Sequence, residues 1–220
     1  MTKATHSIEA ALEDLPVFPL AQVVLFPHAL LPLHVFEARY RTMLRDALAS
    51  HRVIVMAHVP DPTVCNDEGQ PCFASVAGLG IIVEHQPLAD GRSNILLHGQ
   101  ARVRLEELPF VPPYRRARAT VLHDVHTPVR DADRAALVAA ASAFSAEVSR
   151  HDPKFSFRLP QSLEPGRVAD LCAHHLIIDA HARQTILEEL DVAARVRKVI
   201  AELAEQHDAL STRERGGALN

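Results

Sequence analysis

The spacing of apolar residues changes once along the chain, and this change limits the possible folds more than any other feature. Up to residue 122 the apolar residues lie in short runs, several of which alternate with polar residues; beyond residue 130 they recur every three to four positions. The first spacing is typical of half-buried strands and the second of amphipathic helices. The sequence therefore predicts an α+β protein with a β-rich part at residues 1–125, a helical bundle at 130–210 and a frayed polar tail at 211–220.

Strand signals dominate the first part. Apolar or small residues fill every second position over 95–105, and an alternating run over 76–84 precedes it, with Asp90-Gly91 as a turn signal between them. These runs predict a hairpin. The upstream run places four residues on one face of its strand: Ala77, Leu79, Ile81 and Val83.

The other segments of the first part are shorter. We expect strands over 52–59 and 114–122, separated by a polar loop at 60–71. Prolines interrupt residues 15–33 and predict brief strands and corners there. Residues 37–49 carry apolar side chains at helical spacing and predict one amphipathic helix.

Helix-start residues divide the second part. Asp131 or Asp133 is expected to cap the first helix and Pro165 to occupy the first position of the second. Asp179 and Asp191 are expected to cap two more. The pattern therefore predicts four helices.

Bulk composition excludes several classes of protein. Hydrophobic residues make up 48% and charged residues 23% of the chain, which is usual for folded domains and unlike disordered ones. Nothing approaches the roughly 18 consecutive apolar residues of a membrane span, and the first residues lack the order of a signal peptide. Three cysteines do not form a disulfide framework. We therefore expect a cytoplasmic protein without a membrane partner.

Three blocks of sequence together resemble a known family. They are residues 15–44 (LPVFPLAQVVLFPHALLPLHVFEARYRTML), the hairpin with Gly78-x-Gly80, Asp90-Gly91-Arg92 and Gly99-x-x-Arg102-x-Arg104, and residues 165–203. In this order they are similar to the amino-terminal substrate-binding domain of Lon proteases, with Arg183 where many members have lysine. The resemblance implies a PUA-like, mainly antiparallel β-barrel with one prominent helix, followed by a small helical bundle.

The resemblance does not extend to the catalytic modules of Lon proteases. An ATPase P-loop needs a lysine directly after a glycine, but the three lysines, Lys3, Lys154 and Lys198, all lie in other contexts. A GxSxG motif is also missing, and no lysine has the context of a serine–lysine dyad. We therefore predict no catalytic residues, no cofactor and no enzyme activity. The resemblance implies a module that binds unfolded or partly folded proteins and delivers them to a protease or chaperone.

The block at 15–44 supplies the candidate polypeptide-binding residues. Aromatic and histidine side chains there are suited to an apolar groove that accepts an extended chain. The simpler interpretation is that the aromatic residues belong to the core. The candidates are Phe26, His28, His34, Phe36 and Tyr40.

An RNA- or nucleotide-binding module is the main alternative. If the strands over 95–105 and 114–122 are neighbours, Arg102, Arg104, Arg116 and Arg118 form a basic patch. Aromatic residues for base stacking do not interleave them, and the net charge of −4 gives no reason to expect nucleic acid. A solvated, ion-paired strand face is the competing interpretation.

A metal-dependent hydrolase is the third possibility. The densest cluster of metal-ligand types is His174, His175, Asp179 and His181, and Cys65 and Cys72 flank a polar loop. Neither HExxH nor paired CxxC spacing is present, and a helix would point the two adjacent histidines about 100° apart. We therefore predict no metal.

Overall fold

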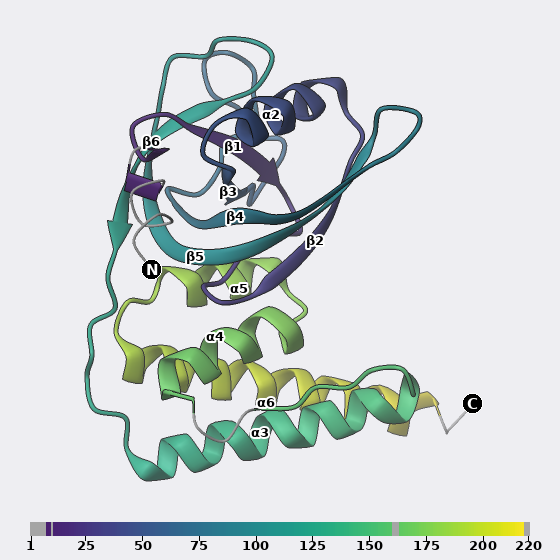
Figure 1. Ribbon diagram of the computed structural model, residues 1–220. Helices are drawn as coiled ribbons and strands as arrows, with labels where there is room; N and C mark the ends of the chain where they lie inside the picture. The colour runs from purple at the N-terminus through teal and green to yellow at the C-terminus, as the bar shows by residue number, and fades with distance from the viewer. Residues whose placement is uncertain (1–7, 10, 160–162, 218–220) are drawn as a thin grey trace. The chain divides into compact units, whose positions relative to one another are not determined.

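The chain divides into two compact units, residues 1–123 and 124–220 (Figure 1). The computed structural model describes residues 8–9, 11–159 and 163–217, with side chains up to residue 210. Strands lie in the first unit and long helices in the second, so the predicted α+β class is confirmed.

Unit 1 contains six strands whose hydrogen-bonded pairings run in a ring. The order β5-β4-β3-β1-β6 returns to β5, and β2 pairs with β5 outside this ring. All pairings are antiparallel except that of β1 with β3. The elements are β1 (Leu15–Leu20), β2 (Leu30–Val35), α2 (Ala38–Ala49), β3 (Val53–His58), β4 (Val76–Pro87), β5 (Ser93–Glu107) and β6 (Arg116–Leu122).

The predicted hairpin is formed by β4 and β5, but one face of β4 differs from the prediction. Ala77 and Leu79 are buried as expected, whereas Ile82 is buried and Val83 is 46% exposed. Register shifts lie between Leu79 and Gly80 and between Ile82 and Glu84. A bulge adds one residue and reverses the faces beyond it. The predicted face holds through Ile81, which packs against the same core cluster as Ala77 and Leu79, and is wrong at Val83.

The segment between β1 and β2 crosses close to β4 and β5 at two glycines. A side chain at Gly78 would overlap with the carbonyl oxygen of Leu25, and one at Gly99 with that of Phe26. The amide of Gly99 donates to Ala29 O at 2.9 Å, and that of His28 donates to Gly99 O at 2.8 Å. The glycines of the second resembling block therefore allow backbones to approach.

The core of the ring is apolar and closely packed. Val17, Val55, Leu79 and Val103 are fully buried in one cluster, which also contains Leu105. These residues lie on four different strands, so burial of their side chains holds the ring together.

Unit 2 is a bundle of four helices. They are α3 (Asp131–His151), α4 (Pro165–Leu176), α5 (Ala180–Glu188) and α6 (Val192–Gly217). Pro165 opens α4 as predicted, and the Asp179 carboxylate accepts from the Ala182 amide at 2.7 Å. Asp191 accepts from the Ala194 amide at 2.7 Å and thereby caps α6. These three helix starts are confirmed.

Helix α6 continues through residues 211–217, where the sequence predicted a frayed tail; residues 218–220 lie outside the described part of the chain. The first helix-breaking residues of this segment are the glycines at 216 and 217. Good helix formers precede them, so backbone propensity is sufficient to extend the helix to that point.

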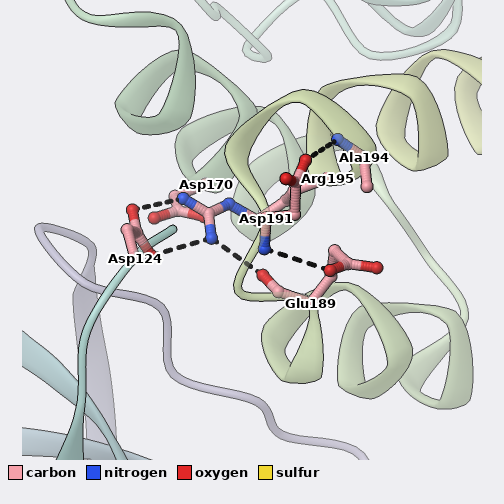
Figure 2. A network of polar contacts seen from close by, with 6 residues as sticks. All are labelled: Asp124, Asp170, Glu189, Asp191, Ala194 and Arg195. Carbon is pink, nitrogen blue, oxygen red and sulfur yellow. Dashed lines mark hydrogen bonds and ion pairs between the residues drawn. The ribbon is translucent and has the colours of Figure 1, made fainter. Parts of the chain in front are cut away.

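A buried arginine joins the beginning of unit 2 to its helices (Figure 2). Arg195 on α6 is 0% exposed and makes two bonds to the Asp124 carboxylate, at 2.5 and 2.9 Å. Its Nε lies 3.1 Å from the Asp170 carboxylate on α4, and its Nη1 donates to the Glu189 carbonyl at 2.8 Å. An arginine buried this completely must be paired on all sides, so the network determines how Asp124 and α4 meet α6.

Candidate functional site

A groove in unit 1 contains the predicted binding residue Tyr40. It consists of adjoining cavities of about 370 and 30 Å³, which share Tyr40, Arg115 and three other lining residues. We call it the Tyr40 groove. It is lined by Pro19, Leu20, Ala21, Glu37, Arg39, Tyr40, Val59, Pro62, Gly69, Gln70, Pro71, Phe110, Pro113, Tyr114 and Arg115.

Tyr40 is held rigidly in this groove. Its ring lies 4.2 Å from the Phe18 ring between centroids, and the Arg39 guanidinium lies 4.5 Å from the ring centre on a cation–π contact. Burial raises the pKa of Tyr40, and Arg39 opposes this in part. The phenol therefore stays neutral and presents an apolar ring with one hydroxyl.

Arg115 fixes the opposite wall. Its side chain is 7% exposed and binds both carboxylate oxygens of Glu107, at 2.5 and 2.7 Å. The same guanidinium donates to the Pro71 carbonyl at 2.6 Å and lies 4.1 Å from the Phe73 ring centre. The loop between β3 and β4 is thus attached to β5 and β6, and the groove has a preformed wall.

The surface of the groove is mainly apolar. Its walls are mostly proline, aromatic and aliphatic surface, with Glu37, Arg39 and Gln70 as polar groups. Among the described residues that line it, there is no serine, cysteine, histidine or lysine, and Glu37 is the one carboxylate. An apolar hollow with a few polar groups is suited to holding side chains of another polypeptide.

The other predicted binding residues lie in different surroundings. Phe26 is 0% exposed and belongs to the core, below the Arg102 guanidinium at 5.9 Å. His28 is exposed and has a positive φ of 65°. Phe26 is therefore inaccessible to a partner, while His28 lies at the surface.

His34 and Phe36 lie together at the end of β2. Their rings stack with centroids 6.0 Å apart, Phe36 is 60% exposed, and His34 bonds to the Asn94 side chain at 2.8 Å. Within the described strands, β2 pairs only with β5. The structure therefore brings two predicted residues together beside a sheet edge and places Tyr40 in the groove.

The four arginines of the alternative basic patch share one face of β5 and β6, which are neighbours. Arg118 pairs with Glu13 at 2.9 Å and Glu106 at 3.4 Å, and Arg116 pairs with Asp14 at 2.7 Å. Arg102 is only 3% exposed, and Arg104 is exposed. Carboxylates therefore neutralise much of this face, as expected of an ion-paired strand surface.

The candidate metal ligands His174 and His175 make ring contacts. His174 and His175 lie edge to face at 4.9 Å, and the His175 ring lies 5.6 Å from that of Phe157. Within the described residues, no group of three or more metal-ligand side chains is placed to hold an ion. All three cysteines are free, and burial raises the pKa of Cys172 to about 12.

Several groove residues were not among the sequence-based candidates. Gln70 lies in a segment that reads as a polar loop, and Phe110 and Tyr114 lie in the proline-containing connection before β6. Arg115 appears in the sequence only as part of an arginine run. The one sequence signal that could have indicated the Arg115 wall is the position of Glu107 and Arg115 on either side of this connection, because the two strands of a hairpin bring such residues together.

The chain matches the sequence profile of the ATP-dependent protease La (LON) substrate-binding domain over residues 14–205. It belongs to this family. The resemblance inferred from the three sequence blocks is therefore confirmed.

Curated LON relatives are similar over nearly all of the chain. The Lon protease of Roseiflexus castenholzii is 29% identical over 203 residues, which is 90% of this chain and 25% of that protein. Lon protease 1 of Thermus thermophilus is 28% identical over 86% of this chain and 24% of that protein. The chain thus spans about a quarter of the length of these relatives.

Solved structures show the same fold. A Lon N-terminal domain protein from Xanthomonas campestris aligns with a TM-score of 0.62 and 21% identity, covering 86% of this chain and 97% of that one. The N-terminal domain of a Mycobacterium avium complex Lon protease aligns with a TM-score of 0.62 and 17% identity, and the alignment covers 87% of this chain and 98% of that one. Among the helices in the described part of this LON-family chain, none has both the length and the apolar content needed to cross a membrane.

Proposed function

We propose that this LON-family domain is a non-catalytic recognition module that binds exposed segments of unfolded or partly folded proteins in the Tyr40 groove. The observation that carries the proposal is the lining of the groove, where proline and aromatic surface surrounds a few fixed polar groups. The family match supports a role in substrate recognition.

The geometry favours modest affinity for many sequences. Two of the polar groups of the groove already bond to each other, as Arg39 pairs with Glu37 at 2.9 Å. Binding therefore depends on many weak apolar contacts rather than on one anchoring charge. We also propose the edge of β2, where His34 and Phe36 lie, as a second surface that could form main-chain bonds with an extended segment.

We further propose that the bound segments are passed to a protease or chaperone. The relatives named above are Lon proteases, and this chain corresponds to about a quarter of each. The neutralised arginine face makes RNA a poorer partner, because its carboxylates would repel phosphates.

Isothermal titration against a reduced, unfolded model protein tests the groove. Ala21 lines it, and Ala21→Trp is expected to fill it and to weaken binding at least about tenfold, which is about 1.4 kcal/mol. Ala49→Trp at an exposed helix position is the matched control and should bind like the unchanged chain.

Two results would contradict the proposal. One is the lack of any heat of binding at high micromolar concentrations of the unfolded protein. The other is an equal affinity for Ala21→Trp and Ala49→Trp, which would locate binding outside the groove.

A further inference from the structure

A second pocket in unit 1 lies between α2 and the turn of the β4–β5 hairpin. Its volume is about 540 Å³, larger than the Tyr40 groove. The helix contributes one wall and the hairpin the other, so we call it the hairpin pocket. It is lined by Ala38, Arg41, Thr42, Leu44, Arg45, Leu48, His85, Pro87, Gly91, Arg92 and Ser93.

The charge of the hairpin pocket is positive. Three arginines line it, and no carboxylate is found among the described residues of its walls. Arg92 pairs with Asp90 at 2.6 Å and Arg45 with Asp46 at 3.4 Å, and both pairs are solvent-exposed. Such pairs are weak, so these arginines remain available to another carboxylate.

Arg41 is the least compensated of the three. Its guanidinium lies against the turn at Gly91, and within the described residues no carboxylate pairs with it. Arg41 and Arg45 are one helical turn apart on the same face of α2, where like charges repel each other. A bound anion would relieve this repulsion.

The floor of the pocket is apolar. Leu44 is 3% exposed and Leu48 half-buried, and Pro87 lies on the hairpin side. Phenylalanine, tyrosine and tryptophan are not found among the described lining residues, and His85 is the one aromatic ring among them. The pocket thus combines an apolar floor with a rim of guanidinium groups.

We infer that the hairpin pocket binds an acidic polypeptide segment in which carboxylate side chains alternate with apolar ones. The carboxylates pair with Arg41, Arg45 and Arg92, and the apolar side chains lie over Leu44 and Leu48. This site is separate from the Tyr40 groove and does not depend on the function proposed for that groove.

Fluorescence anisotropy with a labelled peptide of alternating aspartate and leucine tests the inference on the full chain. The double variant R41Q/R45Q is expected to lose roughly threefold in affinity for each arginine, about tenfold in all, and added salt should weaken the unchanged chain in the same direction. R104Q is the control, because Arg104 is exposed on β5 and does not line the pocket. It should bind as the unchanged chain does.

The counterpart peptide, with asparagine in place of aspartate, is expected to bind about tenfold more weakly than the acidic peptide. Ala21→Trp should leave acidic-peptide binding intact, which separates this inference from the proposal for the Tyr40 groove. Equal affinity of R41Q/R45Q and R104Q, or equal affinity for both peptides, would overturn it. Displacement of the peptide by a single-stranded oligonucleotide that binds more tightly would also overturn the inference, because the pocket would then be a nucleic-acid site.

Discussion

Gly78 and Gly99 are required by the neighbouring backbone, since each lies directly below a carbonyl group of the crossing segment. Neither glycine has a positive φ, so space alone excludes a side chain at these positions. Gly69 has the opposite constraint, with a φ of 71° and open space around it. A methyl group would therefore clash with a backbone carbonyl at Gly78 and Gly99, but at Gly69 it would only strain the local backbone.

This difference predicts two effects of the same substitution. Gly99→Ala forces the crossing segment away from β5 and is expected to lower the free energy of unfolding by about 3 kcal/mol. Gly69→Ala strains only the local backbone and should lower it by about 1 kcal/mol. Urea unfolding measures both, and equal losses would show that the close approach to Phe26 is not important for stability.

At the scale of elements, alternation and helix-start residues predicted the hairpin and three helix starts. The strand over 95–105 was predictable because its alternation is unbroken, whereas the inner face of β4 depends on bulges that the sequence does not mark. Of the residues that line the Tyr40 groove, the sequence predicted only Tyr40 as a binding residue. Other walls come from the loop between β3 and β4 and from the connection between β5 and β6, which Arg115 joins through its bond to the Pro71 carbonyl. Contacts between segments far apart in sequence carry no periodic signal.

The cap of α6 allows a prediction about pH. A hydrogen bond from the Thr127 hydroxyl, followed by one from the Ala194 amide, lowers the pKa of Asp191 below its ordinary value of 3.8. A lowered pKa stabilises the fold above the unfolded value and loses this effect as the pH falls through the folded value. The melting temperature of the unchanged chain should therefore exceed that of the Asp191→Asn variant at neutral pH. The difference between the two should shrink as the pH is lowered below 3.8.

Asp131→Asn is the matched control, because Asp131 begins α3, where no side-chain cap bond is present. Its melting temperature should follow that of the unchanged chain across the pH series more closely than Asp191→Asn does. A constant difference for Asp191→Asn at all pH values would contradict the assignment of the effect to the Asp191 charge.

At the scale of the whole molecule, the two units carry different spectroscopic signals. The chain has no tryptophan, and its two tyrosines, Tyr40 and Tyr114, both lie in unit 1. The long helices lie in unit 2 and dominate the helical circular dichroism. One sample thus reports the unfolding of each unit separately.

Arg195→Met uses these two signals. It removes the ion pairs of Arg195 with Asp124 and Asp170 and is expected to destabilise unit 2 by about 3–5 kcal/mol. The circular dichroism transition should move to lower urea, while the tyrosine transition stays in place. Arg197→Met, on the exposed side of the same helix, should change stability by about 0.5 kcal/mol or less. A joint shift of both signals would mean that the units unfold as one.

The crossing segment also affects how this domain can change over evolution. Leu25 fills the space above Gly78 and Gly80, and Val17, Val55, Leu79 and Val103 inside the ring are fully buried. The groove and the pocket proposed above as binding sites lie on the outer surface, where most substitutions alter stability only slightly. Such a domain can acquire new clients by exchanging surface residues one at a time, while the interior that specifies its fold remains unchanged.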